Sequence, residues 1–156
     1  MRRRIQRSLE LVSQSLRRSE SKPDLDLFRQ VSALIPFKPP KSLPHTTRIG
    51  VVDDVNVYIV DGDWVRRQFC MDYVFGGHDL VYGAGNKAHP ELTFIPDKQI
   101  WIDGRMESYE QTMTLFHEIF ERRQMEKGVS YGKAHAAANR AERALRQHLA
   151  RQKARA

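Results

Sequence analysis

The sequence has one cysteine, Cys70, and no long run of apolar residues. One cysteine cannot form a disulfide within the chain, so the fold does not depend on an oxidising compartment. A membrane-spanning helix needs about 20 consecutive apolar residues, and no segment approaches that length. The basic start, residues 1–4, is not followed by the apolar segment and cleavage site of a secretory signal. These absences predict a cytoplasmic protein that does not enter a membrane.

The two ends of the chain also lack a balance of charge, because basic residues outnumber acidic ones in both. Residues 1–20 hold six basic and two acidic side chains, and residues 140–156 hold six basic and one acidic. The middle carries 14 basic and 16 acidic residues, so the net charge of +7 comes from the ends. Such ends favour weak, non-specific contact with nucleic acid, or they are solvated helix faces. They contain no aromatic residues, so they offer no platform for base stacking.

The hydrophobic pattern predicts an α+β fold that starts with helices. Residues 2–19 have the apolar spacing of an amphipathic basic helix. Asp24 is placed to cap a short helix that ends at Leu34. Four prolines in residues 36–44 exclude regular structure and predict an extended connector.

A small antiparallel sheet is expected next, built from two β-hairpins. The first covers residues 48–60, is rich in β-branched residues, and turns at Asp53 and Asp54. The second joins residues 92–95 to residues 99–102. Between them, Gly76 and Gly77 are expected to form a tight turn with positive φ.

Two helices complete the expected fold. The first runs from Ser108 to Lys127, and Gly128 is suited to end it. The second starts near Ser130 and continues into the 140s. We expect three parts: a basic N-terminal helix and connector at 1–46, a metal-binding domain at 47–150, and a basic tail at 151–156.

The first of these helices carries the pattern His117-Glu118-x-x-Glu121. Residues four apart in a helix project from the same face, so His117 and Glu121 can hold one metal ion. In the HExxH arrangement the glutamate after the first histidine is the general base, and Glu118 has that place here. Glu121 replaces the second histidine, and a carboxylate is also a competent zinc ligand.

The second helix offers a third ligand, His135. A short turn around Gly128 makes the two helices antiparallel neighbours, which brings His135 toward the other two side chains. The predicted set is therefore two histidines and one carboxylate, with a fourth position open to water. Glu142 lies two turns further along the same face, where it either orients a ligand histidine or serves as an alternative ligand.

This region resembles a zincin metallopeptidase core in which HExxH has become HExxE. It is similar to a group of phage and bacterial zincin-like proteins over residues 57–143. The matching residues are Phe94, Ile95, Pro96, Ile100, Trp101, Ile102, Asp103, His117, Glu118, Glu121, Arg122, Met125, Gly128, Tyr131, Ala134, His135, Ala138 and Glu142. The resemblance implies an active-site helix, a ligand helix, and a sheet whose edge strand, Gln99–Asp103, pairs with an extended peptide substrate.

Several residues keep two interpretations. The histidines and glutamates of the motif are either metal ligands or ordinary helix residues whose carboxylates pair with Arg122, Arg123 or Lys127. His78 either donates to a transition-state oxyanion or lies in a tight turn. Tyr131 either donates to the same oxyanion or packs at the start of its helix.

We expect a zinc-dependent hydrolase that cleaves a peptide or amide bond. Manganese, iron and nickel also bind such nitrogen and oxygen ligands. The alternative is a nucleic-acid-associated or assembly protein with a structural metal or none. The family resemblance alone adds a third possibility, a toxin or host-takeover factor from a mobile element.

Overall fold

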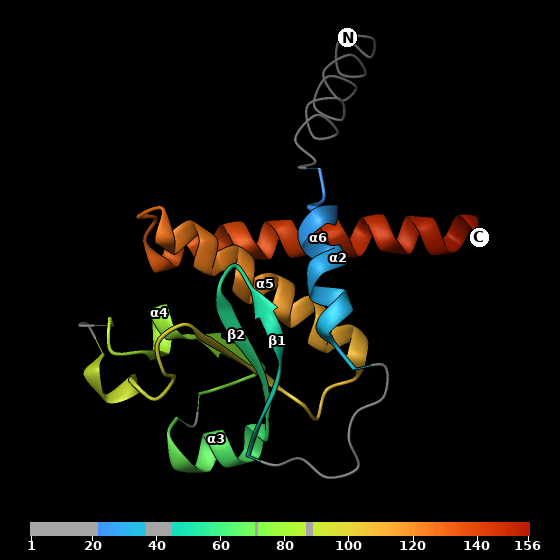
Figure 1. Cartoon of the computed structure of the whole chain (residues 1–156). Helices are drawn as coiled ribbons and strands as arrows, with labels where there is room; N and C mark the ends of the chain where they lie inside the picture. The colour runs from blue at the N-terminus through green and yellow to red at the C-terminus, as the bar shows by residue number, and fades with distance from the viewer. Residues whose placement is uncertain (1–21, 37–44, 71, 87–88) are drawn as a thin grey trace, which may run out of the picture.

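The structure, a computed structural model, describes residues 22–36, 45–70, 72–86 and 89–156 (Figure 1). The basic helix predicted at residues 2–19 and all but the first residue of the predicted connector lie outside this part of the chain. Within it, a four-stranded sheet packs against long helices, which confirms the α+β fold.

The elements follow one another in a simple order. They are α2 (Leu25–Leu34), β1 (Thr46–Val52), β2 (Val55–Val60), α3 (Gly62–Gln68), β3 (Gly76–His78), α4 (Asp79–Tyr82), the 3₁₀ turn η1 (Pro90–Leu92), β4 (Gln99–Asp103), α5 (Ser108–Glu126) and α6 (Tyr131–Arg155). Asp24 caps α2 as predicted, because its carboxylate accepts a hydrogen bond from the Leu27 amide at 2.9 Å. The expected basic tail continues α6 as far as Arg155.

The sheet is mixed, so the expectation of an antiparallel sheet is wrong. Its order is β1-β2-β4-β3, with β2 and β4 parallel and the other two pairs antiparallel. The first hairpin is confirmed, and Asp53 and Asp54 turn it with φ of 52° and 60°. The second hairpin is wrong: Phe94 and Ile95 pack in an aromatic cluster beside the sheet, and this packing overrides their β propensity.

Strand β4 is central, which overturns the expectation that Gln99–Asp103 is an edge strand. Four of its five residues are buried, as expected for a strand covered on both faces. The edge beside α5 is formed instead by the three-residue strand β3.

The pair Gly76-Gly77 belongs to this edge strand and does not form the expected positive-φ turn. Among the described glycines only Gly128 has positive φ. A side chain at Gly76 would meet Thr114 of α5 at 2.8 Å, and one at Gly77 would meet the Tyr82 ring at 2.5 Å. Gly76 therefore allows close approach to α5 and Gly77 close approach to α4, directly before His78.

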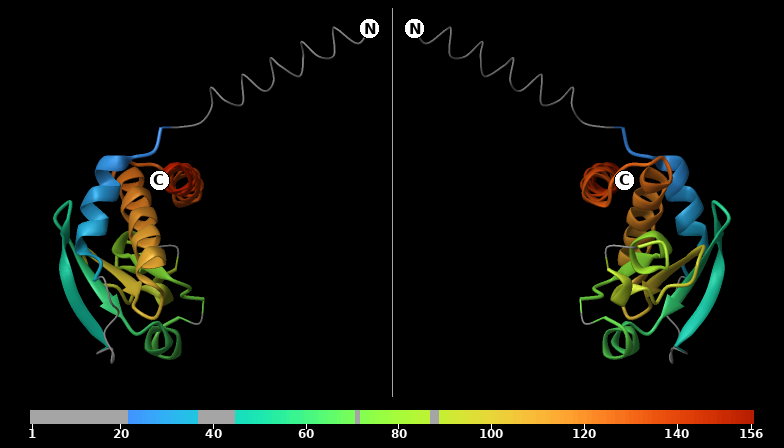
Figure 2. Two further views of the ribbon diagram at one scale, coloured as in Figure 1. Left: turned by 90° about the vertical axis from the view of Figure 1, so that its right-hand side faces the viewer. Right: turned by 90° about the vertical axis from the view of Figure 1, so that its left-hand side faces the viewer.

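Helix α5 lies between the sheet and α6, and α2 packs beside it (Figures 1 and 2). The main core joins α2, the sheet, α5 and α6 through residues such as Leu27, Ile59, Phe116 and Leu145. Ala134 and Ala138 are fully buried, so α6 can approach α5 closely, as predicted. No helix in the described part of the chain has the length and apolar character that crossing a membrane requires.

The turn between α5 and α6 has the predicted glycine at its centre. Gly128 has φ of 88°, and its amide donates to the Met125 carbonyl at 2.9 Å. The Val129 amide donates to the Gln124 carbonyl at 3.1 Å, which completes a Schellman motif. This turn reverses the chain and returns α6 along α5.

Candidate metal centre

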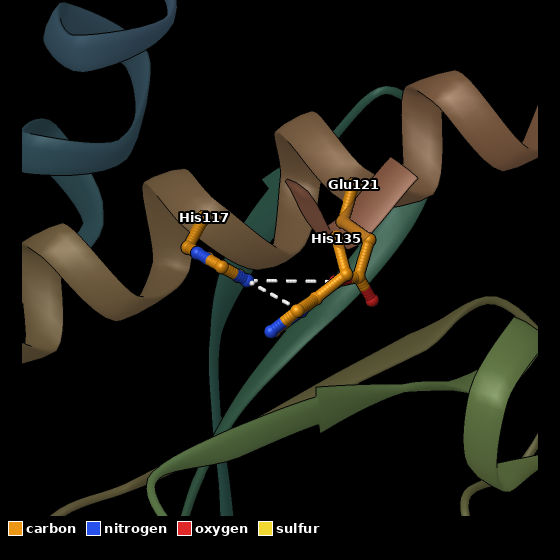
Figure 3. Close-up of side chains that lie close together, drawn as sticks. All are labelled: His117, Glu121 and His135. Carbon is orange, nitrogen blue, oxygen red and sulfur yellow. Dashed lines mark hydrogen bonds and ion pairs between the residues drawn. The ribbon is translucent and has the colours of Figure 1, made fainter. Parts of the chain in front are cut away.

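Three side chains from α5 and α6 converge as the sequence predicts (Figure 3). Nδ1 of His135 lies 2.7 Å from Oε2 of Glu121 and 3.3 Å from Nε2 of His117. The remaining distance, from His117 Nε2 to Glu121 Oε2, is 3.4 Å. His117 and Glu121 come from successive turns of α5, and His135 comes from the first turn and a half of α6.

These distances fit a bound divalent ion. Zinc–ligand bonds of about 2.0–2.1 Å in a tetrahedral site put neighbouring donor atoms about 3.3 Å apart. Two of the three distances are 3.3 and 3.4 Å, and the third, at 2.7 Å, requires only a small side-chain adjustment. Two imidazoles and one carboxylate are also the donor types that a catalytic zinc uses.

Glu142 holds the other nitrogen of His117, in the orienting position predicted for it. Its Oε2 lies 3.0 Å from His117 Nδ1, and its Oε1 accepts a hydrogen bond from Arg146 at 2.8 Å. A carboxylate behind a ligand histidine fixes the ring and raises its basicity. Burial opposes charge on His117, yet hydrogen bonds with Glu121 and Glu142 raise its pKa to about 10.

Glu121 is the most enclosed member of the cluster. Its side chain is 3% exposed, and burial alone would favour the neutral acid. Hydrogen bonds from His117, His78 and His135 outweigh that effect and lower its pKa below the usual range. A buried carboxylate surrounded by histidines is in an environment that also suits a cation.

Glu118 lies beside the cluster and is not one of its three candidate ligands. Its side chain is 13% exposed and lines the cavity in front of the histidines. Its pKa is raised chiefly by burial, an effect that nearby His78 partly opposes. A carboxylate with a raised pKa facing a cavity is suited to accept and return a proton.

The arginines that follow the motif pair with other partners. Arg122 contacts Asp79 at 2.7 Å and Glu126 at 2.5 Å, and Arg123 contacts Asp53 at 2.5 Å. Arg122 and Arg123 therefore do not form the ion pairs with Glu118 and Glu121 that the alternative interpretation expected.

A cavity of about 440 Å³ opens in front of the cluster. His117, Glu118, Glu121 and His135 form part of its wall. The rest of the wall is mixed. It includes polar and charged residues such as Asp72, Glu110 and Arg146, and apolar ones such as Val74 and Phe75, which are 57% and 55% exposed. Tyr131 also lines the cavity, half exposed, with its ring centroid 5.6 Å from that of His135.

His78 occupies a place that neither sequence interpretation described. It is fully buried, and its Nε2 lies 2.9 Å from Oε1 of Glu121. It is 43 residues away from Glu121, and no local pattern links the two. The sequence signal before it was the glycine pair, of which Gly76 allows β3 to lie close to α5.

Comparisons with models of protein families, with curated proteins and with solved structures found no match to this chain. The resemblance to zincins therefore stays a prediction.

Proposed function

We propose that this chain is a zinc-dependent hydrolase that cleaves peptide or amide bonds. The observation that supports the proposal is the convergence of His117, Glu121 and His135 on one point at a cavity wall, at distances suited to a divalent ion. Two imidazoles and a carboxylate leave a coordination position open, as a catalytic site requires.

Each residue has a defined part in this proposal. The three ligands would hold the ion, which supplies Lewis-acid chemistry when bound. Glu118 takes a proton from the attacking water and passes it to the leaving nitrogen, which its raised pKa and its place at the cavity wall favour. Glu142 holds the His117 ring in place through Nδ1. Tyr131 stays a candidate donor to the oxyanion of the substrate.

Exposed apolar side chains beside an edge strand favour a peptide substrate. Exposed apolar side chains, Val74 and Phe75, stand directly before the edge strand β3 and line the same cavity as the ligands. An extended peptide could pair with an edge of this kind and place apolar side chains against them. In this proposal β3 takes the role that the resemblance to zincins implied for Gln99–Asp103.

A second candidate function is non-specific nucleic-acid contact through α6. Its outer face exposes Arg140 and Arg143, and Lys153 and Arg155 extend the charge to the end of the helix. This contact is compatible with the hydrolase.

Metal content is the direct test of the proposed function. Untagged protein, dialysed against zinc and then against buffer, should retain about one tightly bound zinc per chain. His117→Ala and His135→Ala should lose it, whereas His89→Gln, an exposed histidine paired with Glu91, should keep it. Native protein without tight zinc, or equal zinc in all four proteins, would contradict the proposal.

A further inference from the structure

The two oxygens of Glu121 face two different groups of side chains. Oε2 lies 2.7 Å from His135 and 3.4 Å from His117, as described above. Oε1 turns the other way and lies 2.9 Å from Nε2 of His78. The carboxylate therefore stands between two sets of possible ligands.

The second set consists of His78, Glu118 and Glu121. One donor atom from each lies within 4.8 Å of the other two, and His78 Nε2 is 4.0 Å from Glu118 Oε2. Donor atoms around a six-coordinate ion with bonds of about 2.1 Å lie about 3.0 Å apart when adjacent and about 4.2 Å apart when opposite. The distances from His78 Nε2 to Glu121, 2.9 Å, and to Glu118, 4.0 Å, are close to these two values.

Burial makes this set a defined site. His78 is fully buried and is held in β3 by pairing with Ile100 of β4. Glu118 and Glu121 lie on consecutive turns of α5, and their side chains are 13% and 3% exposed. Two buried carboxylates that share a histidine repel each other unless a cation or a proton lies between them.

We propose that His78, Glu118 and Glu121 form a second divalent-cation site, with Glu121 bridging it to the first. This inference rests on the proposed metal centre. A carboxylate that gives one oxygen to each of two ions is the arrangement by which two-metal centres bring their ions within about 4 Å. The cavity gives access through Glu118, which lines its wall.

The second site is weaker than the first. His117 is supported through Nδ1 by Glu142, whereas Nδ1 of His78 has no hydrogen-bond partner within the described residues. A ligand histidine without such a partner typically binds metal 10- to 100-fold less tightly. The two ions also repel each other across the shared carboxylate.

Occupation of the second site has a consequence for Glu118. A carboxylate oxygen that binds a cation no longer accepts a proton freely, and Glu118 is the proposed base. Cation in excess of one equivalent therefore acts as an inhibitor of the hydrolase and not as its cofactor.

Zinc stoichiometry tests the second site without any substrate. Metal-stripped, untagged full chain is dialysed to equilibrium against rising concentrations of free Zn²⁺, and bound zinc is measured by elemental analysis. Native protein should bind two equivalents, with dissociation constants at least tenfold apart. His78→Phe, which keeps a planar aromatic ring without a ligand nitrogen, and Glu118→Gln should each keep the tight equivalent and lose the weak one. His89→Gln should bind two.

The outcomes separate this inference from the proposed function. A single equivalent in the native chain, or a weak equivalent that survives in both His78→Phe and Glu118→Gln, would overturn the second site and leave His78 as a hydrogen-bond donor to Glu121. If His78→Phe lost all zinc through misfolding, Glu118→Gln alone would decide. Absence of the tight equivalent, or its survival in His117→Ala, would instead contradict the proposed function.

Discussion

Arg122 holds Asp79 in a buried, two-bonded ion pair that ties α5 to the start of α4. Its Nε and Nη2 donate to the two carboxylate oxygens at 2.7 and 3.1 Å. The Lys98 amide donates to the same carboxylate at 2.7 Å. Because Asp79 directly follows His78, this pair fixes the end of the edge strand β3 against α5.

Asp79→Asn should therefore destabilise the protein by about 3 kcal/mol at neutral pH, since it leaves a buried guanidinium without its main partner. Urea unfolding followed by circular dichroism measures the change. Asp97→Asn, at an exposed position, should alter stability by less than about 0.5 kcal/mol. Equal stability of the two variants would contradict the role assigned to the pair.

The same pair predicts a pH dependence. Burial alone would raise the pKa of Asp79, but the hydrogen bonds from Arg122 and Lys98 lower it. A lowered pKa contributes stability above the unfolded-state value of about 4, and this contribution is lost as pH falls through the folded-state value. Native protein should lose more stability between pH 6 and pH 3 than Asp79→Asn does. Parallel curves for the two proteins would count against this assignment.

Zinc affinity should rise with pH through the neutral range. Without metal, the His117 pKa of about 10 keeps the ring protonated, and a ligand histidine has to be neutral. Each pH unit between 6.5 and 8.5 should therefore strengthen binding about tenfold through this residue. Competition with a chelator of known affinity measures the dependence. Affinity that is flat above pH 7 would be inconsistent with a proton on His117.

Glu142→Gln should weaken the tight zinc equivalent 10- to 100-fold without abolishing it, because the amide cannot replace the carboxylate behind His117. Glu110→Gln provides a control, since Glu110 pairs with the same Arg146 but, among the described residues, forms no ion pair with His117. Chelator competition on both variants gives the comparison. A Glu142 variant with native affinity would show that this hydrogen bond has no part in binding.

Glu118→Gln should lower hydrolysis of a fluorescence-quenched peptide library about a thousandfold at one zinc equivalent, because it removes the proposed base. The tight zinc equivalent should remain, which distinguishes loss of the base from loss of the metal. Activity close to native in this variant would exclude Glu118 as the group that moves the proton.

Much of the site could be predicted because it lies on one helical hairpin. The i, i+4 spacing of His117 and Glu121 follows from helix geometry, and Gly128 marks the reversal that returns His135. The sheet was harder, because the parallel pairing of β2 with β4 depends on contacts far apart in the sequence. The tight turn expected beside His78 was wrong for the same reason: the position of His78 follows from the strand order and from two glycines that allow close approach.

The α5–α6 hairpin also has a consequence for how the protein folds. His117 is 18 residues from His135 and 25 from Glu142, whereas His78 is 43 residues from Glu121. Short loops close with a smaller entropy loss than long ones, and local contacts form faster. The hairpin therefore brings His117, Glu121 and His135 together early in folding, and zinc, if bound as proposed, would act as a template for it. The edge strand, with His78, would join only once the sheet has assembled.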